Sequence, residues 1–255
     1  MSERRAYLWD LFWLFTRTEF RLRDQGTLIG FLWTLLHPLF IFLILRTLFA
    51  HWMAPIIPHY AGCLLIGIVQ WNFFLTGTDA GLTSLRRKAR LLASYSFPRV
   101  LIVLSAVSAV LLSHLLEWAV LLGVLIAMGI RPGAAWLALP AFIALELALI
   151  TALSCALSIL AVRFRDLERA WSLLLYGFFF LTPVFYTTEV MTGTARSILA
   201  VNPLARIIEG TRAAAIGGQF RPSPAEWALA AGVLALCAAA LALYGRSSRG
   251  ITEIL

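Results

Sequence analysis

The sequence predicts an all-α membrane protein with six transmembrane helices, an N-terminal amphipathic interface helix and a short re-entrant helical segment between spans five and six. Of the 255 residues, 61% are hydrophobic and only 13% are charged, which leaves too little polar surface to cover a soluble globule. Apolar stretches long enough to cross about 30 Å of hydrocarbon recur without a soluble domain between them. We therefore expect a cytoplasmic interface helix over residues 1–26 and one membrane domain over residues 27–255.

Hydrophobic periodicity places each expected element. Residues 6–24 carry apolar side chains at helical spacing, with most charged side chains on other faces, as is typical of a helix lying in the membrane interface. The spans are expected at about 27–49, 60–84, 99–128, 136–162, 169–187 and 224–244.

Arginine and lysine are unevenly distributed between the loops. Fifteen of the 21 basic residues fall in the N-terminal segment, the second-to-third loop, the fourth-to-fifth junction and the C-terminal tail, whereas five fall in the opposite loops. Cytoplasmic loops hold the excess of basic residues, so both termini are expected in the cytoplasm. The net charge of +8 then reflects membrane orientation, and no nucleic acid partner is expected.

The segment 188–223 is an exception to the short loops. It contains an apolar helical run, 204–216, that is too short to cross the membrane. Asn202 and Pro203 precede this run like a helix cap, and two glycines follow it. A re-entrant helix, which would need shelter from lipid, and a plain helix on the outer surface both remain open.

Nucleotide-binding machinery is missing from the sequence. The single lysine is Lys88 in RRKAR, so a phosphate-binding loop that ends in Gly-Lys-Ser/Thr cannot occur. We expect no cofactor in this chain and no enzymatic activity of its own, with ATP and Mg bound by a separate partner.

Several stretches resemble, in order, the permease subunit of type-2 ABC exporters, in particular exporters of lipid-linked O-antigen polysaccharide or teichoic acid. The stretches are GFLWTLLHPLF (30–40), SYSFPRV (94–100), VRFRDLERAW (162–171), LTPVFYTTEV (181–190) and VNPLARIIEGTRAAAIGG (201–218). The resemblance implies a transmembrane subunit that exports a polyprenyl-diphosphate-linked polysaccharide across the bacterial inner membrane. It also implies two copies of this chain bound to two copies of a separate ATP-binding-cassette ATPase.

Three groups of residues are candidates for these roles. Contact with the ATPase is expected in the short basic loop 85–97, at Arg86, Arg87, Lys88, Arg90, Ser94 and Tyr95. Gating or hinge positions are expected at Arg165, Asp166, Pro183, Asn202 and Pro203. The substrate path is expected along aromatic rings that can stack on sugars, at Trp33, Tyr176, Phe179, Phe180 and Tyr186. The alternative for the cluster around residue 165 is a basic cytoplasmic loop with local ion pairs. The alternative for the aromatic residues is an interfacial belt together with lipid-facing rings.

Two groups of polar residues are expected inside spans. They are His114 with Glu117, and Glu146 beside Thr151, Ser154 and Ser158. For both groups an interhelical hydrogen-bond network is favoured over a substrate or proton path. One rival function is a membrane enzyme acting on a polyprenyl-phosphate glycan lipid, which would need paired acids, or an acid with histidine, and a metal. The acids are instead scattered. A second rival, an ion-coupled carrier, would show internal repeats, and none is evident.

Overall fold

The computed structural model describes residues 2–23, 28–95, 97–218 and 222–247. This part of the chain is helical throughout, with short connections and no strand. Its helices are α1 (Ser2–Arg23), α2 (Leu28–Met53), α3 (Tyr60–Arg87), α4 (Ala89–Ser94), α5 (Val100–Ala127), η1 (Ala134–Ala138), α6 (Leu139–Arg163), α7 (Leu167–Leu181), η2 (Thr188–Val190), α8 (Gly193–Val201), α9 (Pro203–Ala215) and α10 (Pro224–Ser247).

Within the described residues, five helical segments are long and apolar enough to cross a membrane. They are Leu36–Met53, Tyr60–Arg87, Val100–Ala127, Ala134–Arg163 and Pro224–Gly245. The predicted all-α membrane architecture is therefore confirmed.

The helix expected at 169–187 is shorter than the sequence suggested. α7 has 15 residues and ends at Leu181, which at 1.5 Å per residue is about 22 Å. Thr182 adopts extended backbone, because the ring of Pro183 disfavours the helical conformation for the residue before it. Six spans therefore stay a prediction.

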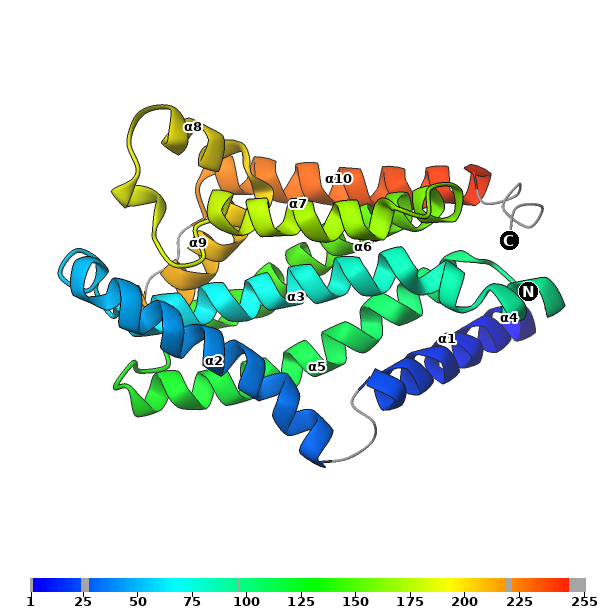
Figure 1. The fold of residues 1–255 in the computed structure, drawn as a ribbon, viewed down its shortest axis with the longest axis horizontal. Coiled ribbons are helices and arrows are strands. Elements are labelled where there is room, and N and C mark those ends of the chain that lie inside the picture. Colours follow the sequence, from blue (N-terminus) through cyan, green and yellow to red (C-terminus); the bar gives the residue numbers. More distant parts are fainter. Residues whose placement is uncertain (1, 24–27, 96, 219–221, 248–255) are drawn as a thin grey trace.

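α3 is the central helix of the bundle and lies between α5 and α6 (Figure 1). Two glycines on α3 let α6 come close. A Cβ on Gly77 would press on Ile150, and a Cβ on Gly81 would overlap the side chain of Ser154. Small residues spaced four apart allow such close approach of membrane helices.

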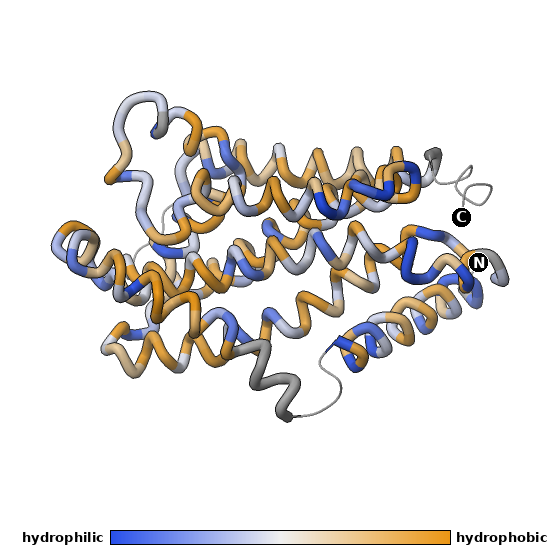
Figure 2. The backbone as a smooth tube through the Cα atoms, viewed as in Figure 1, coloured by the Kyte–Doolittle hydropathy of each residue, from blue (hydrophilic) through white to orange (hydrophobic). Residues whose placement is uncertain are grey.

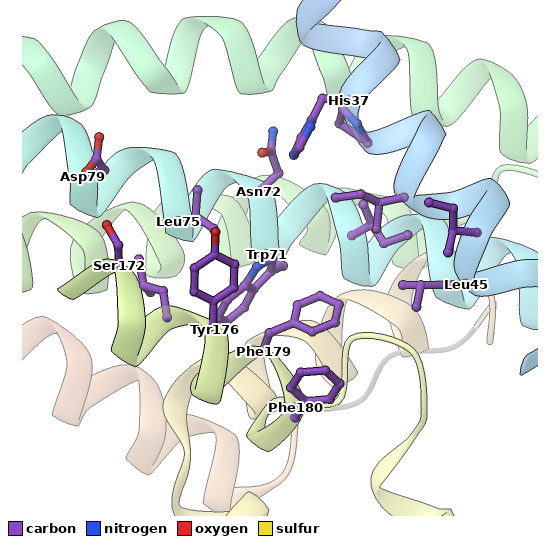
Figure 3. Close-up of a pocket in the computed structure, with 15 residues that line it drawn as sticks. His37, Leu45, Trp71, Asn72, Leu75, Asp79, Ser172, Tyr176, Phe179 and Phe180 are labelled. Carbon is purple, nitrogen blue, oxygen red and sulfur yellow. The ribbon is translucent and has the colours of Figure 1, made fainter. Parts of the chain in front are cut away.

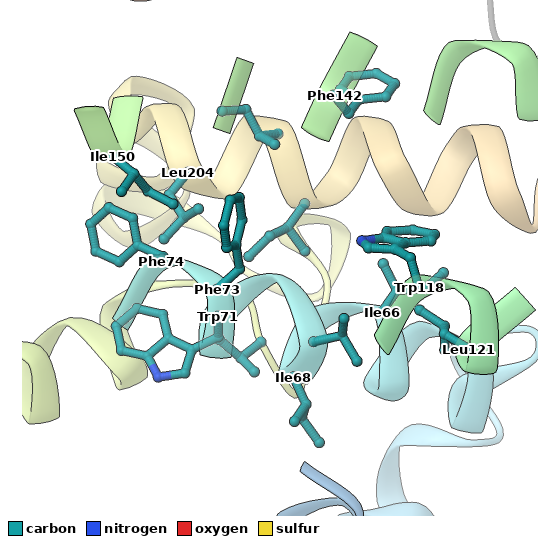
Figure 4. Close-up of a cluster of buried hydrophobic side chains, with 14 of the residues drawn as sticks. Ile66, Ile68, Trp71, Phe73, Phe74, Trp118, Leu121, Phe142, Ile150 and Leu204 are labelled. Carbon is teal, nitrogen blue, oxygen red and sulfur yellow. The ribbon is translucent and has the colours of Figure 1, made fainter. Parts of the chain in front are cut away.

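Large apolar side chains from α3, α5, α6 and α9 fill the space around this contact. Figure 4 shows Phe73 and Phe74 of α3 in one buried cluster with Trp118 of α5 and with Phe142 and Ile150 of α6. The outward faces of α2, α7 and α10 expose many large apolar residues instead, which suits lipid or another apolar partner.

Hydrophilic residues gather at one end of the bundle, where α1 begins, α4 lies and α10 ends (Figure 2). The first turn of α1 and the last turns of α10 therefore lie at the same end (Figure 1). α1 packs along α5 and buries Phe15 and Thr16, while Trp9 and Trp13 stay exposed. Large apolar side chains thus lie on both the packed and the exposed faces of α1, and its place in the membrane interface stays a prediction.

Candidate functional site

A pocket of about 610 Å³ lies between α2, α3 and α7 (Figure 3). This volume is in the usual range for small-molecule sites. Its wall is mostly apolar, with polar groups from all three helices, namely His37, Asn72, Asp79, Ser172 and Tyr176. In Figure 3 the polar side chains of α2 and α3 lie across the pocket from the rings of Phe179 and Phe180.

Three of the five aromatic residues predicted for the substrate path line this pocket together. They are Tyr176, Phe179 and Phe180 of α7, and Tyr176 is 73% exposed. Trp71 of α3 joins them, with its ring centroid 5.5 Å from that of Phe179 in edge-to-face geometry. The sequence analysis did not identify Trp71, because a tryptophan within an apolar span is expected to be a buried core residue.

The other two predicted aromatics are not part of the pocket as described. The side chain of Trp33 lies outside the described residues. Tyr186 is buried beyond the end of α7, where its hydroxyl donates a hydrogen bond to the carbonyl oxygen of Phe180 at 2.9 Å. Tyr186 therefore closes the turn after α7 rather than offering a ring to the pocket.

The segment after α7 is held by a single buried arginine, Arg212 of α9. Its guanidinium donates to the carbonyl oxygens of Val184 at 2.7 Å, Tyr186 at 2.8 Å and Cys63 at 2.9 Å. It also pairs with Glu209, one helical turn earlier, at 3.2 Å. We call this set, Arg212 with Glu209 and the three carbonyl groups, the outer clamp. It joins α9 to α3 and to residues 184–186.

Neighbouring groups tighten the outer clamp. Gly67 of α3 lies so close to the carbonyl of Val184 that a Cβ there would overlap it. The Tyr60 hydroxyl donates to the carbonyl of Phe185 at 3.0 Å. Burial raises the pKa of the Glu209 carboxyl, and the adjacent Arg212 guanidinium opposes that rise. The sequence signal for the clamp was an acid and an arginine three residues apart on a helix whose other polar residues are Arg206 and Thr211.

The expected cap at residues 202 and 203 is confirmed. The Asn202 side-chain oxygen accepts hydrogen bonds from the backbone N–H groups of Leu204 at 3.0 Å and Ala205 at 3.3 Å, and Pro203 is the first residue of α9. The Asn202 amide also donates to the Thr182 hydroxyl at 3.3 Å, beside the buried Pro183. The start of α9 is thereby fixed to the end of α7.

The predicted ATPase contact lies at the other end of the bundle and is crossed by ion pairs. Glu19 of α1 accepts from Lys88 at 2.8 Å and lies 3.5 Å from Arg87. Arg86 pairs with Glu168 of α7 at 2.7 Å. We call these contacts the inner junction. They join α3 to both α1 and α7.

The remaining predicted residues near this end are exposed. Arg90, Ser94 and Tyr95 are exposed on and after α4, and Tyr95 is 69% exposed. Arg165 and Asp166 are exposed in the turn between α6 and α7. The sequence left open local ion pairs within this turn. In the described residues Glu168 instead pairs with Arg86 of α3.

Buried polar groups in the spans follow the sequence prediction only in part. Glu117 accepts a hydrogen bond from Asn72 at 3.3 Å, so an interhelical contact exists there. Glu146 is 0% exposed, and neither of its oxygens has a hydrogen-bond partner among the described residues. The network expected around Glu146 is wrong, because Ser154 and Ser158 turn to backbone carbonyls.

Comparison with known proteins agrees with this architecture. The ABC-2 type transporter family matches residues 10–216. An O-antigen export system permease protein RfbA from Klebsiella pneumoniae is 31% identical over 209 residues, covering 82% of this chain and 81% of that protein. A protein of the same name from Myxococcus xanthus is 30% identical over 197 residues, covering 76% of each chain. With its five apolar helices, the chain is a multi-pass inner-membrane protein and a permease subunit, and it belongs to the ABC-2 type transporter family.

Proposed function

We propose that this chain is the transmembrane subunit of an ATP-driven exporter that moves a polyprenyl-diphosphate-linked polysaccharide, an O-antigen or a related cell-surface glycan, across the inner membrane. The observation that carries the proposal is the pocket between α2, α3 and α7. It combines exposed aromatic rings with hydroxyl, amide and carboxyl groups. Rings stack on sugar faces while polar groups hydrogen-bond to sugar hydroxyls. Relatives with 30–31% identity are named O-antigen export permeases.

In this proposal α7 and residues 182–187 form the fifth of six spans, α10 forms the sixth, and α8 and α9 form a re-entrant segment between them at the outer face. The outer clamp supports this placement, because non-helical backbone at membrane depth is tolerated where protein satisfies its polar groups. The carbonyls of residues 184 and 186 receive such donors from Arg212. The basic inner junction then faces the cytoplasm with both termini.

The pocket forms one wall of the substrate path, and a second copy of the chain supplies the other wall. α2 and α7 border the pocket and expose large apolar residues outward, so a second apolar surface can cover them. Two copies of a separate ATPase would bind at loop 85–97, where α4 presents exposed Arg90, Ser94 and Tyr95. Membrane lipid surrounds the remaining apolar surface.

Reconstitution with an ATP-binding-cassette ATPase that co-purifies with this chain tests the function. The probe is the lipid-linked polysaccharide that accumulates in a strain lacking the permease, and we expect it to stimulate ATP hydrolysis by the complex in proteoliposomes. A complex that assembles but responds to no lipid-linked glycan would refute the proposal.

Charge reversal tests the coupling surface. Glutamate at Arg86, Arg87 and Lys88 should abolish the glycan-stimulated part of ATP hydrolysis while the chain still inserts, because three basic contacts become repulsive. The matched control places glutamate at Arg131 and Arg196, near the opposite end, and should keep the stimulation. Equal loss in both variants would place the contact elsewhere.

A further inference from the structure

The α3 side of the pocket carries hydrogen-bond acceptors and little positive charge, while His37 of α2 and the hydroxyl groups of Ser172 and Tyr176 of α7 can also donate. Asp79 contributes a carboxyl group and Asn72 an amide, while arginine and lysine are absent from the described residues that line the wall. The two arginines that follow on the same helix, Arg86 and Arg87, turn toward Glu168 and Glu19. Anionic groups in this pocket would therefore meet the Asp79 carboxyl group, whose basic neighbours Arg23 and Arg87 are not among the described residues of the wall.

The orientation of the Asn72 amide is fixed from behind by Glu117 of α5. The amide nitrogen of Asn72 donates to Glu117 Oε1 at 3.3 Å. A carboxylate can only accept hydrogen bonds, so the amide must turn its NH₂ group toward Glu117. The carbonyl oxygen of the amide, an acceptor, is then the group left for the pocket that Asn72 lines (Figure 3).

A second buried residue, His114, lies beside Glu117 without a hydrogen bond to it among the described residues. The Trp118 indole N–H donates to His114 Nε2 at 2.8 Å, so the proton of the neutral ring lies on Nδ1, which faces Glu117 Oε2 at 3.7 Å. The imidazole also stacks on Phe73, with ring centroids 4.0 Å apart and an interplanar angle of 6°. His114 and Glu117 are 1% and 4% exposed, so protein contacts rather than solvent determine their orientation.

We propose that the pocket selects neutral, hydroxyl-rich glycan chains over anionic ones, and that Glu117 is the positioning residue that sets this preference by presenting the Asn72 carbonyl oxygen. This inference rests on the proposed export function and specifies its substrate class. Sugar hydroxyls donate to the Asn72 oxygen and to Asp79, and Trp71 and Tyr176 offer rings to sugar faces. In a repeat unit with a carboxylate or phosphate, the anionic oxygens would face the Asn72 oxygen and the Asp79 carboxyl group. This repulsion lowers the affinity for the anionic glycan.

Two lipid-linked probes test the preference in proteoliposomes that hold the permease and its ATPase. One is a polyprenyl-diphosphate-linked mannose polymer, which is neutral along its chain. The other is a polymer of equal length with one uronic acid in each repeat. The measurement is the probe concentration that gives half-maximal stimulation of ATP hydrolysis, together with the maximal rate.

For the unmodified chain we expect a half-maximal concentration about tenfold lower for the neutral probe. Glu117→Met keeps the length of the side chain and removes the acceptor. It should raise the half-maximal concentration for the neutral probe about fivefold to tenfold, with a maximal rate that changes less than about twofold. Glu117→Gln keeps an acceptor for Asn72 and should restore the original value. Leu116→Met, an exposed neighbour on α5, is the matched control and should change neither quantity.

Asp79→Asn supplies an independent arm, because it removes the charge at the pocket wall without touching the buried groups. It should reduce the discrimination between the two probes to about twofold. Equal stimulation by both probes in the unmodified complex, or an effect of Glu117→Met that Glu117→Gln shares, would overturn the inference while leaving the export function intact. Stimulation by neither probe, together with none by the lipid-linked polysaccharide that accumulates in the strain lacking the permease, would overturn the export function itself.

Discussion

Replacing Arg212 with methionine should open the connection between α7, α9 and α3. Methionine keeps much of the apolar stem and removes the guanidinium. Three backbone carbonyls then lose their donor, those of Cys63, Val184 and Tyr186, and Glu209 loses its ion-pair partner. Because Arg212 is only 4% exposed, water does not readily replace these interactions.

The free-energy cost follows from the hydrogen bonds and the ion pair that the substitution removes. A hydrogen bond to a charged group contributes about 1.5–3 kcal/mol, and removing one member of a buried ion pair costs about 3–5 kcal/mol. Residues 184–186 are not helical and can relax toward new partners, so these contributions do not add in full. We expect a loss of about 3–5 kcal/mol, which lowers the melting temperature of a chain of this size by about 10 °C.

Thermal unfolding of the permease in lipid nanodiscs, followed by tryptophan fluorescence, measures this change. The matched control is Arg206→Met on the same helix, because Arg206 forms no ion pair or side-chain hydrogen bond within the described part of the chain. It should shift the melting temperature by less than about 2 °C. A shift that small for Arg212→Met, or equal shifts for both variants, would show that the outer clamp does not hold this segment.

Three further predictions concern other parts of the fold. Gly81→Leu should prevent stable packing of α3 on α6, because even a Cβ overlaps Ser154, and the variant should be lost from size-exclusion profiles of detergent-solubilised protein. Asn202→Ala should cost about 1 kcal/mol in thermal unfolding, because α9 loses the cap that binds two backbone N–H groups; Asn202→Ser should recover most of it. Removing Arg212 takes away the group that opposes the raised pKa of Glu209. A carboxyl whose folded pKa lies above its unfolded value loses stability as pH rises between the two, so the deficit of Arg212→Met should be smaller at about pH 5 than at about pH 8; a deficit independent of pH would exclude Glu209 as its source.

The parts of the fold that depend on local sequence were predictable. Of the six spans that apolar runs predicted, five correspond to described helices long and apolar enough to cross a membrane. Asn202 with Pro203 marked the start of α9, because a cap uses side chains within three residues of the backbone it binds. The end of α7 was placed six residues too late, at 187 instead of Leu181. The aromatic run continues past that point, and the restriction that Pro183 imposes on Thr182 was given too little weight.

Contacts between distant residues could not be predicted from one sequence. Arg212 meets the carbonyl of Cys63 across 149 positions, and Arg86 meets Glu168 across 82. Neither spacing has a local period, so a local ion pair for Glu168 was as plausible as the one found. The pocket shows the same limit, because its aromatic residues on α7 were identified from composition whereas Trp71 and Asn72 join them only through the packing of α3.

Helix α7, which bears the aromatic wall of the pocket, makes polar contacts at its two ends and is mostly exposed between them. At its inner end Glu168 binds Arg86, and beyond its outer end Thr182 binds Asn202. Between these points α7 buries Trp171 and Leu175, and the Trp171 indole N–H donates to the Thr78 hydroxyl of α3 at 3.2 Å. A helix held in this way transmits displacement of an end along its length, because its backbone hydrogen bonds make it stiff. Any movement of α3 at the inner junction would therefore shift the α7 wall through the Arg86–Glu168 pair, and the width of the pocket would change without the core between α3 and α6 having to repack.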